Sequence, residues 1–150
     1  TPKLLVAFIH EKNAEISGWT YAHELGRMHL QQTFEDQIST TCYDNATEEN
    51  ADDLLAKAIA DGNNLIFTTS PPLLKASLKA AIEHPEVKIL NCSLNTSHRY
   101  IRTYYARMYE AKFLMGAIAG AMSKNGKIGY IADYRYDCQH QCLRSWCKNG

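Results

Sequence analysis

The chain has 150 residues, of which 45% are hydrophobic and 21% are charged, which is enough for one globular domain with a real core. Its net charge is zero, and no basic patch or run points to nucleic acid as a partner. The longest apolar run, residues 113–122, is far shorter than the roughly 20 residues that a membrane span requires.

Strand and helix patterns alternate along the chain. Apolar or Thr- and Ile-rich runs predict strands at residues 4–10, 37–43, 64–69, 87–92 and 127–132, with a short extended segment at 100–105. Helical spacing of apolar residues predicts helices at residues 20–33, 47–61, 70–83 and 108–123. Repeated strand–helix units with short loops predict an α/β fold, with a mostly parallel sheet of five to six strands and helices on both faces.

Helix ends and buried faces follow from the same spacing. Thr47 is the expected N-cap of the second helix. The first helix is expected to bury one face, with Gly26 allowing close approach to the sheet: Ala22, Leu25, Gly26 and His29. The third is expected to bury a stripe of four residues: Leu74, Leu78, Ala81 and Ile82. The last helix is apolar on most sides and is expected to be among the most buried.

The carboxyl ends of the predicted strands should share one polar, hydroxyl-rich edge, where ligands of open α/β sheets bind. The loop after the first strand delivers Trp19 and Thr20 to the mouth of this strand–loop–helix unit. A Trp at that position is well placed to stack on a flat ligand. The alternative is that Trp19 is a staple that packs the loop onto the helix, and the residues alone slightly favour the staple.

Motifs of the common catalytic classes are missing from the sequence. It contains no Gly-x-Gly-x-x-Gly after the first strand, no P-loop and no Gly-x-Ser-x-Gly elbow. Ser70 precedes two prolines, which suits a helix cap better than a nucleophile. The histidines lack metal spacing in the body of the chain. We therefore expect no catalytic residue, no metal and no cofactor, and a binding site at the polar edge.

Four segments then carry a family likeness, in matching order over residues 4–134: residues 4–9, 18–27, 64–70 and 106–116. Together they resemble the basic membrane protein family, substrate-binding lipoproteins of ABC transporters, many of which are purine nucleoside receptors. The resemblance implies the type I periplasmic-binding-protein fold, in which two α/β lobes close on a ligand. Residues 1–134 would then be the first lobe, and the second lobe would be absent from this chain.

The resemblance also implies six ligand-binding positions: Trp19, Thr20, Thr69, Ser70, Ser93 and Glu110. Trp19 would stack on the nucleobase and Thr20 would hydrogen-bond it, while Thr69 and Ser70 would line the cleft. Ser93 stands where many relatives carry an Asp, and Glu110 either binds ligand or only caps the last helix. Residues 12–17 lack the Asp that many relatives have in the first loop, so the ligand's identity stays open.

The function implied by the resemblance is binding of a small solute, a purine nucleoside or a related molecule, and not an enzymatic activity. The partner would be an ABC transporter permease. The full-length protein would be extracytoplasmic and membrane-anchored, with the anchor and signal absent from this chain. The chief alternative is a free-standing flavodoxin-like signalling or regulatory domain. A small α/β hydrolase would need a nucleophile–base pair that the sequence does not offer.

Residues 135–150 form a distinct tail. Its crowded cysteines and histidine invite a zinc interpretation: Cys138, His140, Cys142 and Cys147. However, codons permitted for this segment, read one nucleotide later, can spell Gly-Met-Thr-Ala-Asn-Ile-Asn-Ala-Phe-Ala-Leu-Gly-Ala-Lys-Met. That sequence resembles the helix that follows in relatives. We therefore interpret the tail as a frameshifted or irregular segment that ends in premature truncation.

Overall fold

The computed structural model describes residues 3–93 and 98–131, which fall into two compact units, Thr1–Tyr105 and Ala106–Gly150. The first unit contains a sheet and three α-helices, and the second contains a single described helix, α4. The predicted tail, residues 135–150, lies outside the described residues, so its interpretation stays a prediction.

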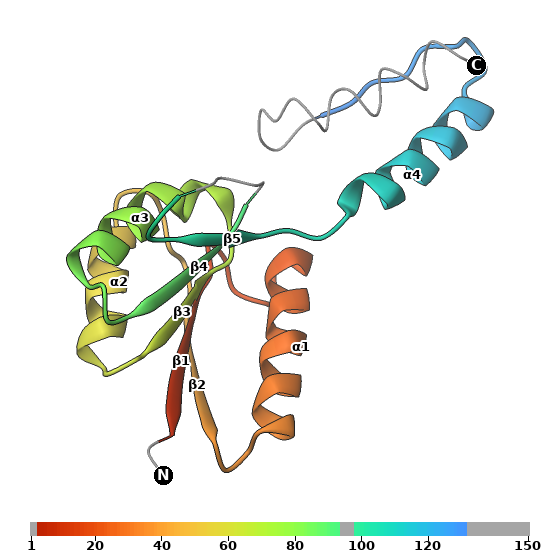
Figure 1. Cartoon of the computed structure of the whole chain (residues 1–150). Coiled ribbons are helices and arrows are strands. Elements are labelled where there is room, and N and C mark those ends of the chain that lie inside the picture. Colours follow the sequence, from red (N-terminus) through yellow and green to blue (C-terminus); the bar gives the residue numbers. More distant parts are fainter. Residues whose placement is uncertain (1–2, 94–97, 132–150) are drawn as a thin grey trace. The chain divides into compact units, whose positions relative to one another are not determined.

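One parallel sheet organises the first unit (Figure 1). Its strands, in the order β2-β1-β3-β4-β5, are Ile38–Tyr43, Leu4–Ile9, Leu65–Thr68, Lys88–Cys92 and Arg102–Tyr104. Every neighbouring pair is parallel, and the register sets Phe8 beside Phe67. Figure 1 shows α1 on one face of the sheet and α2 and α3 on the other. The α/β fold with helices on both faces is therefore confirmed.

Hydrogen bonds and backbone conformation at the helix ends define where the helices begin and end. Their bounds are Gly18–Thr33 for α1, Ala51–Ala60 for α2, and Leu74–Glu83 for α3, which follows the 3-10 turn Pro71–Leu73. Thr47 and Asn50 exchange side-chain-to-backbone bonds of 2.6 and 3.2 Å, the reciprocal pattern of a capping box, in the turn just before Ala51. The Thr47 hydroxyl therefore caps this turn as predicted, although the residue adjoining the helix bounds is Asn50, which makes no side-chain cap bond of its own. Gly62 follows α2 with φ +88°, a conformation that favours glycine.

The hydrophobic core lies between the sheet and the helices α2 and α3. Ala7, Ile9, Ile66 and Ile89 from the strands meet helix residues that include Leu55, Ala58, Leu73 and Ala81. Full burial of one such Leu or Ile stabilises the fold by about 1.5–3 kcal/mol. The predicted stripe of α3 is partly wrong, because Ile82 is 52% exposed and Ser77 and Ala80 face the core with Ala81.

The face that α1 turns toward the sheet is polar, which contradicts the prediction. Ala22, Leu25, Gly26 and His29 are exposed, and a Cβ on Gly26 would meet nothing within 4 Å. The less exposed side of the helix includes Thr20, His23, Glu24 and Arg27. The reason is that the strands beneath α1 carry polar partners for these side chains. Apolar spacing therefore identified the solvent side of the helix.

Two predictions for residues 100–131 need correction. Arg102–Tyr104, within the predicted extended segment, is the fifth strand, whereas residues 127–131 of the predicted strand 127–132 lie outside any strand. An apolar run forms a strand only where neighbouring backbone supplies hydrogen-bond partners. The helix α4, Met108–Met122, has the predicted extent, but none of its residues is buried. Among the described residues of its unit there is no second helix or strand to cover it.

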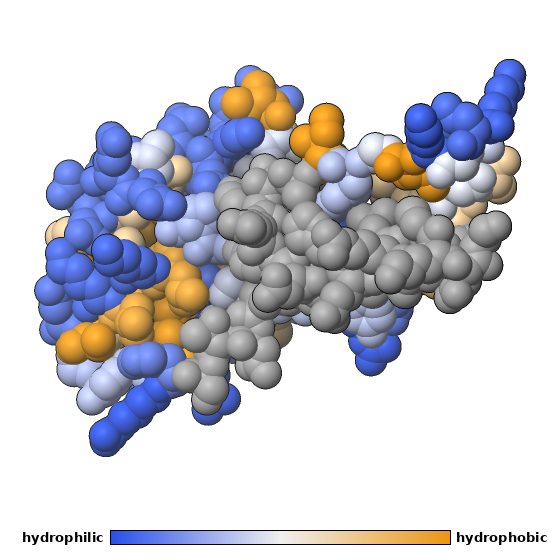
Figure 2. All heavy atoms as spheres, turned by 90° about the horizontal axis from the view of Figure 1, so that it is seen from above, coloured by the Kyte–Doolittle hydropathy of each residue, from blue (hydrophilic) through white to orange (hydrophobic). Residues whose placement is uncertain are grey.

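The surface is mixed in polarity. In the view of Figure 2 most of the coloured surface of the first unit is hydrophilic, and apolar side chains gather in a few separate groups. Within the described part of the chain, none of the helices has the length and apolar character needed to cross a bilayer.

Candidate functional site

Polar side chains gather at the carboxyl ends of β1, β3 and β4, as the sequence predicted. His10 follows β1, Thr69 and Ser70 follow β3, and Ser93 follows β4. All four side chains are buried, with exposed fractions of 0 to 4%. The polar side chains at this edge of the sheet therefore lie beneath the surface. The neighbouring segment that is partly exposed is the first turn of α1.

Trp19 lies in that first turn and reaches across to β3. Its indole Nε1 donates to the carbonyl oxygen of Thr69 at 2.6 Å. The ring centroid lies 5.4 Å from that of His23 and 6.1 Å from that of Tyr105. Trp19 is partly exposed, so a residue whose ring orientation is fixed by this bond still has accessible surface. The bond attaches α1 to the end of β3, whereas the staple interpretation expected Trp19 to pack the preceding loop onto the helix.

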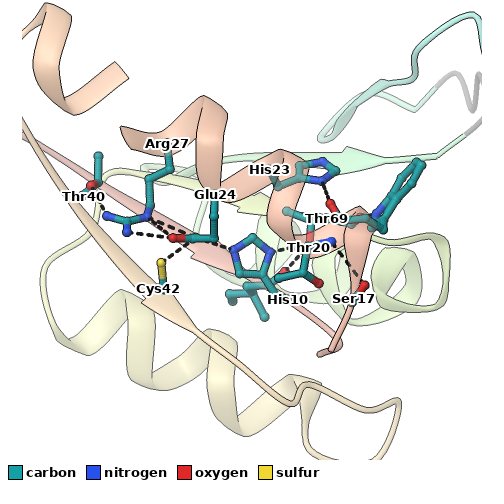
Figure 3. Close-up of polar contacts among 11 residues, drawn as sticks. His10, Ser17, Thr20, His23, Glu24, Arg27, Thr40, Cys42 and Thr69 are labelled. Atoms are coloured by element: carbon teal, nitrogen blue, oxygen red, sulfur yellow. Dashed lines mark hydrogen bonds and ion pairs between the residues drawn. The ribbon is translucent and has the colours of Figure 1, made fainter. Parts of the chain in front are cut away.

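His10 is the buried centre of the network in Figure 3. Its Nδ1 lies 2.8 Å from the Thr69 hydroxyl, and its Nε2 lies 2.9 Å from a carboxylate oxygen of Glu24. The imidazole therefore joins the end of β1 to the end of β3 on one side and to α1 on the other. Both ring nitrogens are engaged, which is how a fully buried imidazole is stabilised.

Glu24 collects the donors of this network. Arg27 binds both of its carboxylate oxygens, at 2.7 to 3.1 Å, and Cys42 donates to one of them at 2.8 Å. Partial burial acts to raise the pKa of Glu24, but the hydrogen bonds from Arg27, Cys42 and His10 outweigh it and lower the pKa to about 2. Burial and the bond to Glu24 raise the pKa of the Cys42 thiol to about 12. The carboxylate is therefore ionised and the thiol is protonated at neutral pH.

The same three side chains have the ligand types of a metal site. The ligating atoms of His10, Glu24 and Cys42 all lie within 4.8 Å of one another. However, the Arg27 guanidinium already neutralises the carboxylate, and a protonated thiol is a poor ligand. The arrangement fits an internal hydrogen-bond network better than a cation site.

Asn91, on β4, organises the opposite side of the edge. Its amide nitrogen donates to the Thr68 hydroxyl and to the Ser70 carbonyl, each at 2.9 Å. Within the described residues, three buried polar atoms at this edge have no hydrogen-bond partner: Ser70 Oγ, Asn91 Oδ1 and Ser93 Oγ. A buried polar atom left unpaired costs roughly 1–3 kcal/mol, so these atoms are available to further donors or acceptors.

The structure brings five of the six predicted site residues into one unit. Thr20 is 2% exposed in the first turn of α1, beneath the solvent-exposed surface, which leaves little of it for direct contact with a ligand. Trp19, Thr69, Ser70 and Ser93 are described above. Glu110 belongs to the second unit, where it is exposed in the first turn of α4 and pairs with Arg107 at 3.2 Å.

Sequence reasoning missed the network behind Trp19. A signal was present, because the polar residues of the first helix recur at helical spacing: Thr20, His23, Glu24, Arg27 and Gln31. Such a stripe marks a buried polar face when strands opposite carry matching groups. Here Arg27 donates to Thr40 of β2 at 2.9 Å, and Gln31 accepts from the Thr40 backbone N–H at 2.9 Å.

Known proteins resemble this chain in sequence and in fold. A purine-binding protein of Brucella abortus (strain 2308) is 35% identical over 130 residues, which is 86% of this chain and 37% of the relative. The chain thus spans little more than a third of that relative's length.

Two solved structures show the same fold at low identity. An ABC transporter solute-binding protein of Burkholderia multivorans matches with a TM-score of 0.74 and 13% identity, over 99% of this chain and 58% of that one. A solute-binding protein of an ABC transporter system from Aeropyrum pernix K1 matches with a TM-score of 0.67 and 20% identity, over 83% and 34%. These likenesses confirm the type I periplasmic-binding-protein-like fold.

A family model matches a longer stretch of the chain than the purine-binding relative does. Residues 3–145 match the ABC transporter substrate-binding protein PnrA-like family, which is the family that the motifs predicted. The chain belongs to the PnrA-like family of ABC transporter substrate-binding proteins.

Proposed function

We propose that this chain contributes to binding a flat, hydroxyl-bearing solute, a purine nucleoside or a related small molecule, at the edge where β1, β3 and β4 end. It would act as part of a substrate-binding protein and not as an enzyme. The family and the purine-binding relative from Brucella support this choice. They favour it over a free-standing signalling domain.

The observation that carries the proposal is the 2.6 Å bond from the Trp19 indole to the Thr69 carbonyl. An aromatic ring binds a base well when its orientation is fixed before the ligand arrives, because less entropy is then lost on binding. Stacking of a base on an aromatic side chain is worth roughly 1–3 kcal/mol in nucleic-acid complexes. Trp19 would supply that stacking.

The unpaired polar atoms support the second half of the proposal. Ser70 Oγ, Asn91 Oδ1 and Ser93 Oγ carry a desolvation cost that a ligand or a bridging water would relieve. Like Thr20, these groups lie beneath the surface, so they would reach the hydroxyls of a sugar or the ring nitrogens of a base through a bridging water. Glu110 stays a candidate contact, with capping of α4 as the equal alternative.

The partner and the location follow from the family. Substrate-binding proteins of ABC transporters are extracytoplasmic. We extend this to a membrane-anchored full-length protein that delivers its solute to a permease. The contacts with the permease and the anchor are part of the proposal.

The test is an NMR titration of the 150-residue chain with adenosine, which measures dissociation constants up to the millimolar range. A single edge contacts only one side of a ligand, so we expect a dissociation constant near 1 mM or weaker, about −4 kcal/mol. Glucose, which offers hydroxyls without an aromatic ring, serves as the control and should bind more weakly.

Two substitutions separate stacking from stapling. Trp19→Phe keeps an aromatic face and loses the indole N–H, whereas Trp19→Leu loses both. Stacking predicts that Trp19→Phe, which keeps an aromatic face but loses the orienting bond, binds adenosine roughly three- to tenfold more weakly, and that Trp19→Leu loses binding. Equal affinity of both variants and the wild type would show that Trp19 is a staple only.

A further inference from the structure

We propose that His10 is a positioning residue of the ligand site, because its imidazole holds Thr69, and Thr69 holds the Trp19 ring. The proposal rests on the proposed function for its effect on ligand binding. The contacts that link His10 to Trp19 do not depend on that function. They involve described residues at the ends of β1 and β3 and in the first half of α1 (Figure 3).

The first step is the orientation of the imidazole. The ionised Glu24 carboxylate can only accept, so His10 must carry a hydrogen on Nε2 to make the 2.9 Å bond. Glu24 is itself held by Arg27, and Arg27 is held by Thr40. This chain of contacts fixes the ring and directs Nδ1 at Thr69.

The second step is the state of the Thr69 hydroxyl, which has one hydrogen and two neighbours. Its Oγ1 lies 2.8 Å from His10 Nδ1 and 3.1 Å from the carbonyl oxygen of Ile9. With a neutral imidazole the hydroxyl donates to Nδ1, and with an imidazolium it accepts from Nδ1 and donates to Ile9. In both states the His10–Thr69 bond persists, so the end of β3 stays attached to the end of β1.

The third step reaches the ligand-facing ring. The backbone N–H of Thr69 donates to the Ile9 carbonyl at 3.0 Å, and its carbonyl accepts the Trp19 indole at 2.6 Å. The side chain and the backbone N–H of Thr69 are thus fixed from β1, and the carbonyl orients the indole. His10, which is fully buried, acts on the ligand only through these contacts.

The test uses two amide substitutions that each keep half of the imidazole's hydrogen bonding. His10→Asn places an amide nitrogen near the Nδ1 position and keeps the bond to Thr69. His10→Gln places it near the Nε2 position and keeps the bond to Glu24. Both are made in a Trp146→Phe background, which leaves Trp19 as the single tryptophan of the two in the chain.

Two readouts are compared: the chemical shift of the indole Nε1–H and the dissociation constant for adenosine. We expect His10→Asn to match the parent in both. We expect His10→Gln to move the indole resonance toward that of free indole and to weaken binding roughly three- to tenfold, as for loss of one hydrogen bond. Thermal unfolding checks that both variants are folded.

The same indole shift in His10→Gln and in the parent would overturn the proposal, as would equal displacement in both variants. If the parent binds no adenosine, the proposed function fails while the indole resonance still decides the role of His10. If a His10 variant does not fold, Thr69→Val replaces it, because valine deletes the hydroxyl and keeps the carbonyl. An unperturbed indole resonance in Thr69→Val would also overturn the proposal.

Discussion

The indole nitrogen of Trp19 and the carbonyl oxygen of Thr69 lie 2.6 Å apart, although 50 positions separate the two residues in sequence. This bond ties the start of α1 to the carboxyl end of β3. Attachment and stacking are therefore compatible roles, because the bond uses only the indole N–H and Trp19 stays partly exposed.

Trp19→Phe should lower the free energy of unfolding by about 1 kcal/mol, the typical contribution of one hydrogen bond. Trp19→Leu should cost more, because the ring contacts with His23 and Tyr105 are lost as well. Urea unfolding measures both. Tyr21→Leu is the control, since Tyr21 is 53% exposed and should change stability by less than about 0.5 kcal/mol. Equal values for all three variants would contradict the structural role of Trp19.

Ser70→Ala and Ser77→Ala should have opposite consequences, although both serines are buried. The Ser77 hydroxyl bonds to the Thr68 hydroxyl at 2.7 Å and to the Leu73 carbonyl at 2.6 Å, so its loss should cost about 1–3 kcal/mol. Ser70 Oγ has no partner among the described residues, so its removal should be neutral or stabilising while adenosine binding weakens. Denaturant unfolding and the NMR titration measure the two effects. A large loss of stability in Ser70→Ala would refute the unpaired assignment.

Glu24 should govern part of the acid stability. Its pKa in the folded state is about 2, below its usual value of 4.5, so the folded state favours the ionised form. The stabilisation is therefore fully present above about pH 4.5 and is lost as the pH falls toward 2. Glu24→Gln should flatten that part of the pH–stability curve, measured by thermal unfolding between pH 2 and 6. Glu48→Gln, at an exposed position, is the control, and an unchanged slope in Glu24→Gln would rule out this role.

Much of the fold was predictable because the strands β1 to β4 are compact apolar or β-branched runs and the helices have clear end signals. That pattern placed Thr69, Ser70 and Ser93 after strand ends and Trp19 in the loop before the first helix, whereas their assignment to a ligand site came from the family resemblance. The inner face of α1 was not predictable from apolar spacing, since Glu24 and Arg27 are partly buried there against polar partners, which are His10 at the end of β1 and Thr40 and Cys42 of β2. Such pairing depends on contacts between distant segments, which a single sequence does not reveal.

The region after β4 shows the same limit. The three residues of β5 form a strand because β4 supplies an open parallel edge, with Leu90 beside Arg102. The more apolar run at residues 127–131 forms no strand with any other described segment. Local composition therefore favoured a strand at residues 127–132 over one at residues 100–105, whereas among the described residues only the second of these segments contains a strand.

The tail makes a prediction at the level of the gene. Sequencing of the coding DNA beyond codon 134 should reveal, one nucleotide out of frame, the helix sequence that relatives contain. Tight, stoichiometric zinc binding that requires Cys138, His140, Cys142 and Cys147 would contradict this interpretation.

The measurement that tests the central claim most directly is the NMR shift of the Trp19 ring protons when adenosine is added to the Trp146→Phe chain. A purine stacked on the indole should move these protons upfield through its ring current, in a saturable manner and with a dissociation constant in the millimolar range. Glucose at the same concentration should leave them in place. Unchanged Trp19 ring protons at adenosine concentrations that saturate the shifts of backbone amides elsewhere, or no shifts anywhere, would contradict purine stacking on Trp19.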